Sequence, residues 1–140
     1  MNIWNAAVGE ALIPFVKPAI AQEQLRRYAD ASGDHNPIHL DEEAARRVGL
    51  DGVIAHGMLS MAFLGQFAEQ QIADTPEAFV AQLKVRFSGM VHLDDTLTCL
   101  GTVTANAESA GLRTVTIECW AQNQKGEKVT SGEAILAANS

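Results

Sequence analysis

One stretch of this 140-residue chain restricts the fold more than any other, a helical segment with almost no polar face. Residues 56–73 have the length and composition of a helix, which Thr75-Pro76 ends. Apolar residues lie on nearly every face of this helix: Met58, Leu59, Met61, Ala62, Phe63, Leu64, Phe67 and Ala68. Because a helix that is apolar all round must be covered on all sides, the sequence predicts a buried central helix.

Four segments with strand patterns follow this helix and can cover it. Apolar and polar residues alternate over residues 79–88 and 112–123, and residues 96–105 are rich in threonine and β-branched residues. After a turn at 124–127, residues 129–137 predict the last strand. Short connections favour antiparallel pairing. We therefore predict an α+β fold in which a curved antiparallel sheet wraps around the central helix, with an edge that a second copy would cover.

The residues before the central helix predict shorter elements. Residues 12–16 are expected to form an edge strand that contains Pro14, and residues 21–31 and 42–48 are expected to form helices. Asp41 is a good N-cap for the second of these helices. Pro37 lacks an amide donor and disfavours helical backbone at the residue before it, so residues 34–40 are expected to form an irregular loop.

Composition and charge limit the class of protein. Ten Lys and Arg residues against 17 Asp and Glu give a net charge of −7, which argues against a nucleic acid or an anionic membrane surface as the main partner. Two cysteines exclude a disulfide scaffold and a CxxC zinc site. The N-terminal residues lack the basic head of a signal peptide, and no apolar run is long enough for a membrane span. We expect a cytoplasmic protein with one domain over residues 1–140.

The densest cluster of polar residues lies in the irregular loop, from Ser32 to His39. Asp34 and His39 are five residues apart; about 140° would separate them on a helix, whereas an irregular loop lets them converge. A carboxylate and an imidazole that share a water form an acid/base pair near neutral pH. The alternative is a simple turn, because Asp, Asn, Gly and Pro favour turns. Spacing alone leaves both interpretations open.

A metal site is a second hypothesis for the same loop. His35 and His39 form an H-x3-H pair, and Asp34 is a third potential ligand. This spacing suits a helix, which Pro37 prevents here, and no further Cys or His pair supports the site. We therefore expect no metal in this loop.

Nucleophilic catalysis has weak support. Ser60 lies inside the apolar helix, four residues after His56, but no G-x-S-x-G motif surrounds it. Cys99 and Cys119 lie in strand patterns, where a small buried thiol is the more ordinary explanation.

The first residues of the central helix, His56-Gly57, are a further candidate site. Free amides and the positive end of the helix dipole stabilise a developing oxyanion, and Gly57 lets a ligand approach the backbone closely. The alternative is that Gly57 only relieves crowding where the helix enters the core.

Residues 28–39, Y-A-D-A-S-G-D-H-N-P-I-H, resemble the hydratase motif of MaoC-like proteins, the (R)-specific enoyl-CoA hydratases and related (R)-3-hydroxyacyl dehydratases. The resemblance extends to I-A-H-G-M-L-S at residues 54–60, and weaker similarity continues over residues 83–87 and 131–134. The combination of G-D-x-N-P-x-H and A-H-G-M is specific. It implies the hot-dog fold of this family, a sheet wrapped around a central helix.

The resemblance also implies a reaction. Members of this family hydrate trans-2-enoyl thioesters of coenzyme A or acyl carrier protein to (R)-3-hydroxyacyl thioesters, or dehydrate in reverse. Transferred to this sequence, Asp34 and His39 would hold and activate the water, and Asn36 would help to place this pair. The Gly57 amide would stabilise the thioester oxygen. No metal or redox cofactor is needed, because the thioester itself acidifies C2.

The family usually works as a dimer of hot dogs, so a homodimer is expected, and a heterodimer with a related subunit is the alternative. Two other functions compete with the hydro-lyase. A hot-dog thioesterase would need a carboxylate base beside the central helix, where Glu69 is a poor candidate because it lies far down the helix. A non-catalytic acyl-binding subunit of a larger complex is disfavoured by the intact Asp34 and His39 pair.

Overall fold

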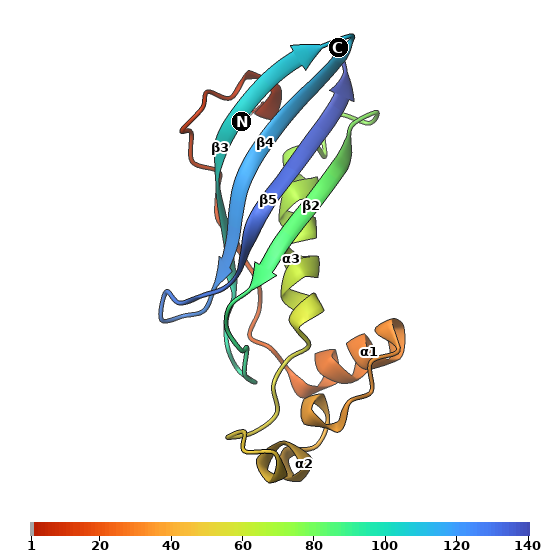
Figure 1. The fold of residues 1–140 in the computed structure, drawn as a ribbon, viewed down its shortest axis with the longest axis vertical. Helices are drawn as coiled ribbons and strands as arrows, with labels where there is room; N and C mark the ends of the chain where they lie inside the picture. The colour runs from red at the N-terminus through yellow and green to blue at the C-terminus, as the bar shows by residue number, and fades with distance from the viewer. Residues whose placement is uncertain (1) are drawn as a thin grey trace.

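The computed structural model describes residues 2–140 and shows a curved antiparallel sheet with one long helix against its concave face (Figure 1). The elements in chain order are η1 (Ile3–Asn5), β1 (Phe15–Val16), α1 (Gln22–Ser32), η2 (Pro37–His39), α2 (Glu42–Arg47), α3 (Gly57–Gln71), β2 (Phe79–Phe87), β3 (Thr98–Ser109), β4 (Leu112–Gln122) and β5 (Lys128–Asn139). This arrangement confirms the predicted α+β fold and its central helix.

The sheet has five strands in the order β1-β3-β4-β5-β2, and every neighbouring pair is antiparallel. Strand β2, the first long strand in the sequence, therefore lies at one edge, and the two-residue β1 lies at the other. Three pairs contain a register shift, between Val80 and Gln82, between Val103 and Ala105, and between Ala121 and Gln122. Such irregularities increase the local twist and bend a strand, which suits a sheet that curls around a helix.

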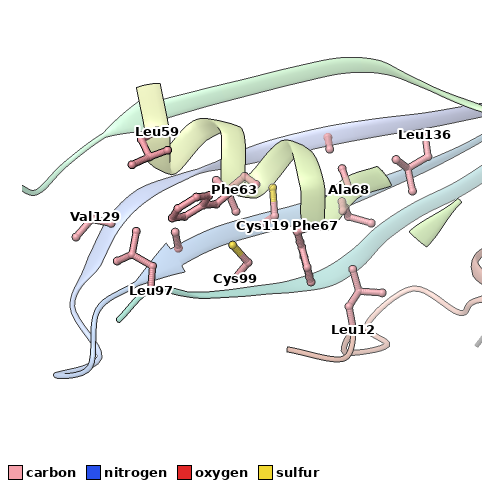
Figure 2. Close-up of a cluster of buried hydrophobic side chains, with 14 of the residues drawn as sticks. Leu12, Leu59, Phe63, Phe67, Ala68, Leu97, Cys99, Cys119, Val129 and Leu136 are labelled. Carbon is pink, nitrogen blue, oxygen red and sulfur yellow. The ribbon is translucent and has the colours of Figure 1, made fainter. Parts of the chain in front are cut away.

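The core lies between α3 and the concave face of the sheet (Figure 2). Leu64, Phe67 and Ala68 of α3 have no exposed surface, and Phe63 is 4% exposed. Strand residues that face them include Cys99, Cys119, Val129 and Leu136, together with Leu97 just before β3. Complete burial of a side chain the size of Leu or Phe contributes about 1.5–3 kcal/mol, so this one face of α3 anchors the fold.

The prediction that the central helix is buried on all sides is wrong. Met58 is 54% exposed, and Ala62, Gln66 and Glu69 are also exposed. The sheet curves around only one side of α3, so the opposite side stays uncovered although several of its residues are apolar. This uncovered side consists of Met58, Ala62, Gln66 and Glu69 and is called the open face of α3 below.

The predicted element boundaries differ from the structure by a few residues. The central helix begins at Gly57 and ends at Gln71, and β3 continues to Ser109. Strand β1 is shorter than predicted, although the backbone on either side of it also bonds to the sheet, through Leu12 to Gly101 and Lys17 to Leu97. Pro14 lies between these contacts and has no amide hydrogen to donate. No helix in the described part of the chain has both the length and the apolar character to cross a membrane.

The pairing of β2 with β5 depends on the absence of a side chain at Gly132, which lies opposite Val85. A Cβ atom at this position would collide with the carbonyl of Lys84 in the β2 backbone. We therefore expect Gly132→Ala to lower the free energy of unfolding by about 2 kcal/mol or more, because two main chains must separate. Chemical denaturation monitored by circular dichroism measures this loss.

Gly65→Ala is the matched control, because a Cβ there meets only Leu83 Cδ2 at 3.8 Å. Replacing a helical glycine by alanine is worth up to about 1 kcal/mol, so Gly65→Ala should leave stability unchanged or raise it. Equal unfolding midpoints for Gly132→Ala and the parent protein would show that the two strands are not held as close as the structure indicates.

Candidate active site

The loop after α1 adopts its shape through local hydrogen bonds. Gly33 ends α1 in the left-handed region, at φ 82°, and its amide donates to the Ala29 carbonyl. The Asp34 amide donates to Ser32 Oγ at 3.1 Å, and the Asn36 amide donates to Asp34 Oδ1 at 3.2 Å. These are the turn interactions predicted for such residues.

Asn36 begins the short η2 turn that carries His39. Its Oδ1 accepts the Ile38 amide at 3.2 Å, and its backbone lies outside the helical region at φ −56° and ψ 126°, as the following Pro37 requires. The His39 amide donates back to the Asn36 carbonyl at 3.0 Å. Asn36 therefore holds the turn from which the His39 side chain projects.

The loop brings Asp34 and His39 together. His39 Nε2 lies 3.7 Å from Asp34 Oδ2, and the two side chains are 9% and 51% exposed. His39 Nδ1 lies 2.7 Å from the Ile54 carbonyl, which only accepts hydrogen bonds, so Nδ1 carries the proton and neutral His39 presents a free lone pair on Nε2. A separation of 3.7 Å is too long for a direct hydrogen bond. Both atoms can instead bind one water between them.

His56 is a third member of the cluster, and sequence reasoning placed it only at the start of the helix. Its Nε2 donates to the Asp34 carbonyl at 3.0 Å, and its ring stacks on His39 with centroids 4.0 Å apart. The Tyr28 ring also contacts His56, with centroids 4.8 Å apart. Burial lowers the pKa of His56, so this imidazole is neutral at pH 7. Burial and the nearby Asp34 carboxylate raise the pKa of the Tyr28 phenol.

Gly57 begins α3 beside these side chains, and no side chain caps the helix at His56. Its backbone is exposed, which leaves the positive end of the helix open to a ligand. A Cβ atom at Gly57 would lie 3.5 Å from Phe87 Cδ1, an ordinary contact. Crowding therefore does not require glycine here, which favours the alternative that Gly57 gives access to its amide.

The geometry does not support the predicted alternative of a metal bound by the H-x3-H pair. His35 is exposed and its Nε2 pairs with Asp30 Oδ1 at 3.0 Å, away from His39. Asp34, His39 and His56 each place one potential ligand atom within 4.8 Å of the others. However, His56 Nε2 donates a hydrogen bond to the Asp34 carbonyl, and His56 Nδ1 is buried. Only Asp34 and His39 are then left to bind a metal, fewer protein ligands than a structural or catalytic zinc site has.

The candidate nucleophiles lie in the core. Ser60 is 3% exposed, and its hydroxyl donates to the Gly57 carbonyl at 2.8 Å and also contacts Thr130 Oγ1. These contacts give Ser60 a structural role at the start of α3. Cys99 and Cys119 are free and fully buried on neighbouring strands.

Comparison with known proteins identifies the family. Residues 5–124 match the model of the MaoC like domain. The chain belongs to the MaoC-like domain family. It is 30% identical over 117 residues to an (R)-specific enoyl-CoA hydratase of Rhodospirillum rubrum, covering 84% of this chain and 78% of that protein. It is also 28% identical over 150 residues to a UPF0336 protein of Streptomyces avermitilis, and this match covers 99% of this chain and 96% of that protein.

A third relative shows that this domain also occurs inside much longer chains. The MaoC-like chain is 36% identical over 130 residues to the fatty acid synthase beta subunit TOXC of Cochliobolus carbonum, but these residues are only 6% of that protein. Among solved structures, the (R)-hydratase of A. caviae involved in PHA biosynthesis has a TM-score of 0.79 and 26% identity, with 94% and 96% of the two chains covered. The predicted hot-dog fold is thereby confirmed. A ChsH1-ChsH2 complex of Mycobacterium tuberculosis shares this fold at a TM-score of 0.76 and 19% identity.

The two thiols provide a test of the core around the site. Burial raises the pKa of Cys99 to about 12 and that of Cys119 to about 11. We expect neither thiol to react with Ellman's reagent at pH 8 in the folded protein, because each is protonated and inaccessible. Both should react once guanidinium unfolds the chain, and absorbance of the released thiolate counts them. Rapid labelling of a folded thiol would contradict the packing of β3 and β4 against α3.

Proposed function

We propose that this MaoC-like protein hydrates trans-2-enoyl thioesters, carried on coenzyme A or acyl carrier protein, to (R)-3-hydroxyacyl thioesters, and catalyses the reverse dehydration. The observation that carries the proposal is the separation of 3.7 Å between Asp34 Oδ2 and His39 Nε2, beside the exposed start of α3 at Gly57. The proposal assigns proton exchange to the Asp34 and His39 side chains and oxyanion stabilisation to the Gly57 amide.

The proposed reaction begins with a water between Asp34 and His39. The pair accepts one proton as the water oxygen forms its bond to C3, and the C2–C3 π electrons move toward the thioester carbonyl. The Gly57 amide stabilises the negative charge that develops on the thioester oxygen, without reorganisation of the protein. The pair then delivers a proton to C2, so the atoms of water are added across the double bond. Dehydration is the same sequence in reverse.

Asp34 and His39 each have a nearby residue of the same type that serves as a control. We expect Asp34→Asn and His39→Ala each to lower kcat by at least about 10²-fold, because general acid–base catalysis contributes that much. Asp30→Asn and His35→Ala change the same residue types four positions earlier, in an exposed pair outside the cluster, and should keep near-full activity. Hydration of crotonyl-CoA, followed as loss of the enoyl absorbance, measures all four variants.

Retention of near-full activity by Asp34→Asn or His39→Ala would remove that residue from the mechanism. The same assay distinguishes the competing functions when free thiol is measured in parallel. Absorbance loss without thiol supports hydration, whereas thiol release supports a thioesterase. The structure gives the thioesterase little support, because Glu69 is twelve residues from Gly57 along α3, or about 18 Å. If enoyl substrates of several lengths give neither absorbance loss nor free thiol, a non-catalytic acyl-binding subunit is favoured.

We also infer that a second copy covers the edge strand β2 and the open face of α3. Strand β2 presents nine residues at an edge of the sheet, where no other strand within residues 2–140 pairs with its outer backbone donors and acceptors. Phe79 and Phe87 at its two ends are 52% and 47% exposed. A related subunit in place of a second copy is the alternative.

Light scattering tests this assembly. The protein should have about twice the mass of its 15.0 kDa chain. Ala62→Glu places a charge in the centre of the open face and should shift the protein toward monomer. Ala31→Glu makes the same change on an exposed position of α1 and should leave the mass unchanged. A monomeric parent protein would contradict the homodimer and favour a different partner.

A further inference from the structure

Three rings, those of Tyr28, His56 and His39, contact one another beside the Asp34 carboxylate. The Tyr28 ring lies against His56 at 4.8 Å with a 58° tilt, and His56 stacks on His39 at 4.0 Å with a 27° tilt. His56, in the middle, is 2% exposed. His56 is the most deeply buried of the three rings, yet the proposed reaction uses neither of its nitrogens.

Backbone carbonyls fix the two histidines in opposite tautomers. The Ile54 carbonyl accepts from His39 Nδ1, which leaves the lone pair of His39 on Nε2. The Asp34 carbonyl accepts from His56 Nε2, which leaves the lone pair of His56 on Nδ1. This Nδ1 is buried and has no hydrogen-bond partner among the described residues. Such an orphan atom costs free energy, and the hydrogen bond made by Nε2 recovers part of that cost.

The bond from His56 acts on the backbone of Asp34. The Asp34 carboxylate is half exposed, and the bond that it accepts from the Asn36 amide is 3.2 Å long. Its position relative to His39 therefore depends on the main chain that carries it. Ser32 Oγ holds the Asp34 amide on one side, and His56 Nε2 holds the Asp34 carbonyl on the other, from a residue 22 positions along the chain.

We propose that His56 is a positioning residue that sets the distance between the Asp34 carboxylate and His39 Nε2, through its hydrogen bond to the Asp34 carbonyl and its stack on the His39 ring. The inference rests on the proposed hydration reaction for its consequence in turnover. Its structural content, a neutral His56 with the proton on Nε2, stands independently.

The surroundings of His56 require it to stay neutral. The titratable groups that face it are Tyr28 from α1, Asp34 and His35 from the loop, and His39 from η2. A proton on Nδ1 would enter a buried position with no acceptor, next to the ring of His39, which itself takes up a proton in the proposed reaction. A neutral His56 leaves the proton transfer to Asp34 and His39.

Two substitutions of His56, by Gln and by Asn, test whether the hydrogen bond to the Asp34 carbonyl matters or whether any polar side chain at this position suffices. The amide nitrogen of Gln reaches the place of His56 Nε2, whereas that of Asn reaches only the place of Nδ1. We expect His56→Gln to keep kcat within about threefold of the parent, and His56→Asn to lower it at least about tenfold, because misplacement by 1 Å can cost about 10²-fold. KM should stay within about twofold in both variants, since His56 is buried and takes no part in the proposed reaction. Crotonyl-CoA hydration and thermal unfolding are measured side by side.

Equal losses in both amide variants at unchanged thermal midpoints, or full activity of His56→Asn, would overturn the proposal. A second measurement uses the parent protein and does not depend on how the variants fold. Imidazole ¹⁵N chemical shifts should show His56 neutral at pH 7 with its proton on Nε2. A charged ring, or a proton on Nδ1, would overturn the inference even if both variants were unfolded. A parent protein without hydratase activity would instead contradict the proposed function while the shifts still test His56.

Discussion

The hydrogen bond between His39 Nδ1 and the Ile54 carbonyl, 2.7 Å long, is the interaction on which the site depends. It fixes which nitrogen of His39 is free, and so whether this residue can act as a base. The Ile54 carbonyl is itself held, because the Ile54 amide donates to the Ile38 carbonyl and the next amide, of Ala55, donates to the Val91 carbonyl. Backbone hydrogen bonds thus join the η2 turn, the residues before α3 and the segment before β3. The orientation of the His39 imidazole is therefore set by the main chain.

The rest of the fold brings the start of α3 to these backbone hydrogen bonds. Packing of Phe63, Leu64 and Phe67 against the sheet fixes the position and direction of the helix, and with it the direction of the Gly57 amide. The Ser60 hydroxyl, bonded to the Gly57 carbonyl and in contact with Thr130 of β5, ties the first turn of the helix to the sheet. An oxyanion site made from a backbone amide is only as well placed as the helix that carries it, so the apolar core has a direct consequence for the proposed chemistry.

Sequence patterns predict most of the elements but less of their arrangement. Alternation predicts β2 and β4, β-branched composition predicts β3, and Asp41 caps α2 through the Glu43 amide as expected. No local pattern predicts that β2 pairs with β5 at the edge. In the site, spacing left a turn and an acid/base pair as alternatives. The structure contains the turn, and the hydrogen bonds of this turn also bring the Asp34 carboxylate to 3.7 Å from His39, as the proposed pair requires. The contribution of His56 could not be predicted from spacing, because its partner is a backbone carbonyl, and any residue type supplies one.

Two apolar side chains beside Gly57 connect the proposed chemistry to the proposed assembly. Met58 follows Gly57 and is 54% exposed, and Phe87, whose ring lies nearest to Gly57, is 47% exposed. Contiguous exposed apolar surface is typical of interaction sites. Met58 belongs to the open face of α3 and Phe87 ends β2, so the surface proposed to meet a second copy borders the Gly57 amide. Under the proposed function and assembly, a thioester held at that amide would therefore lie beside the surface between the two copies.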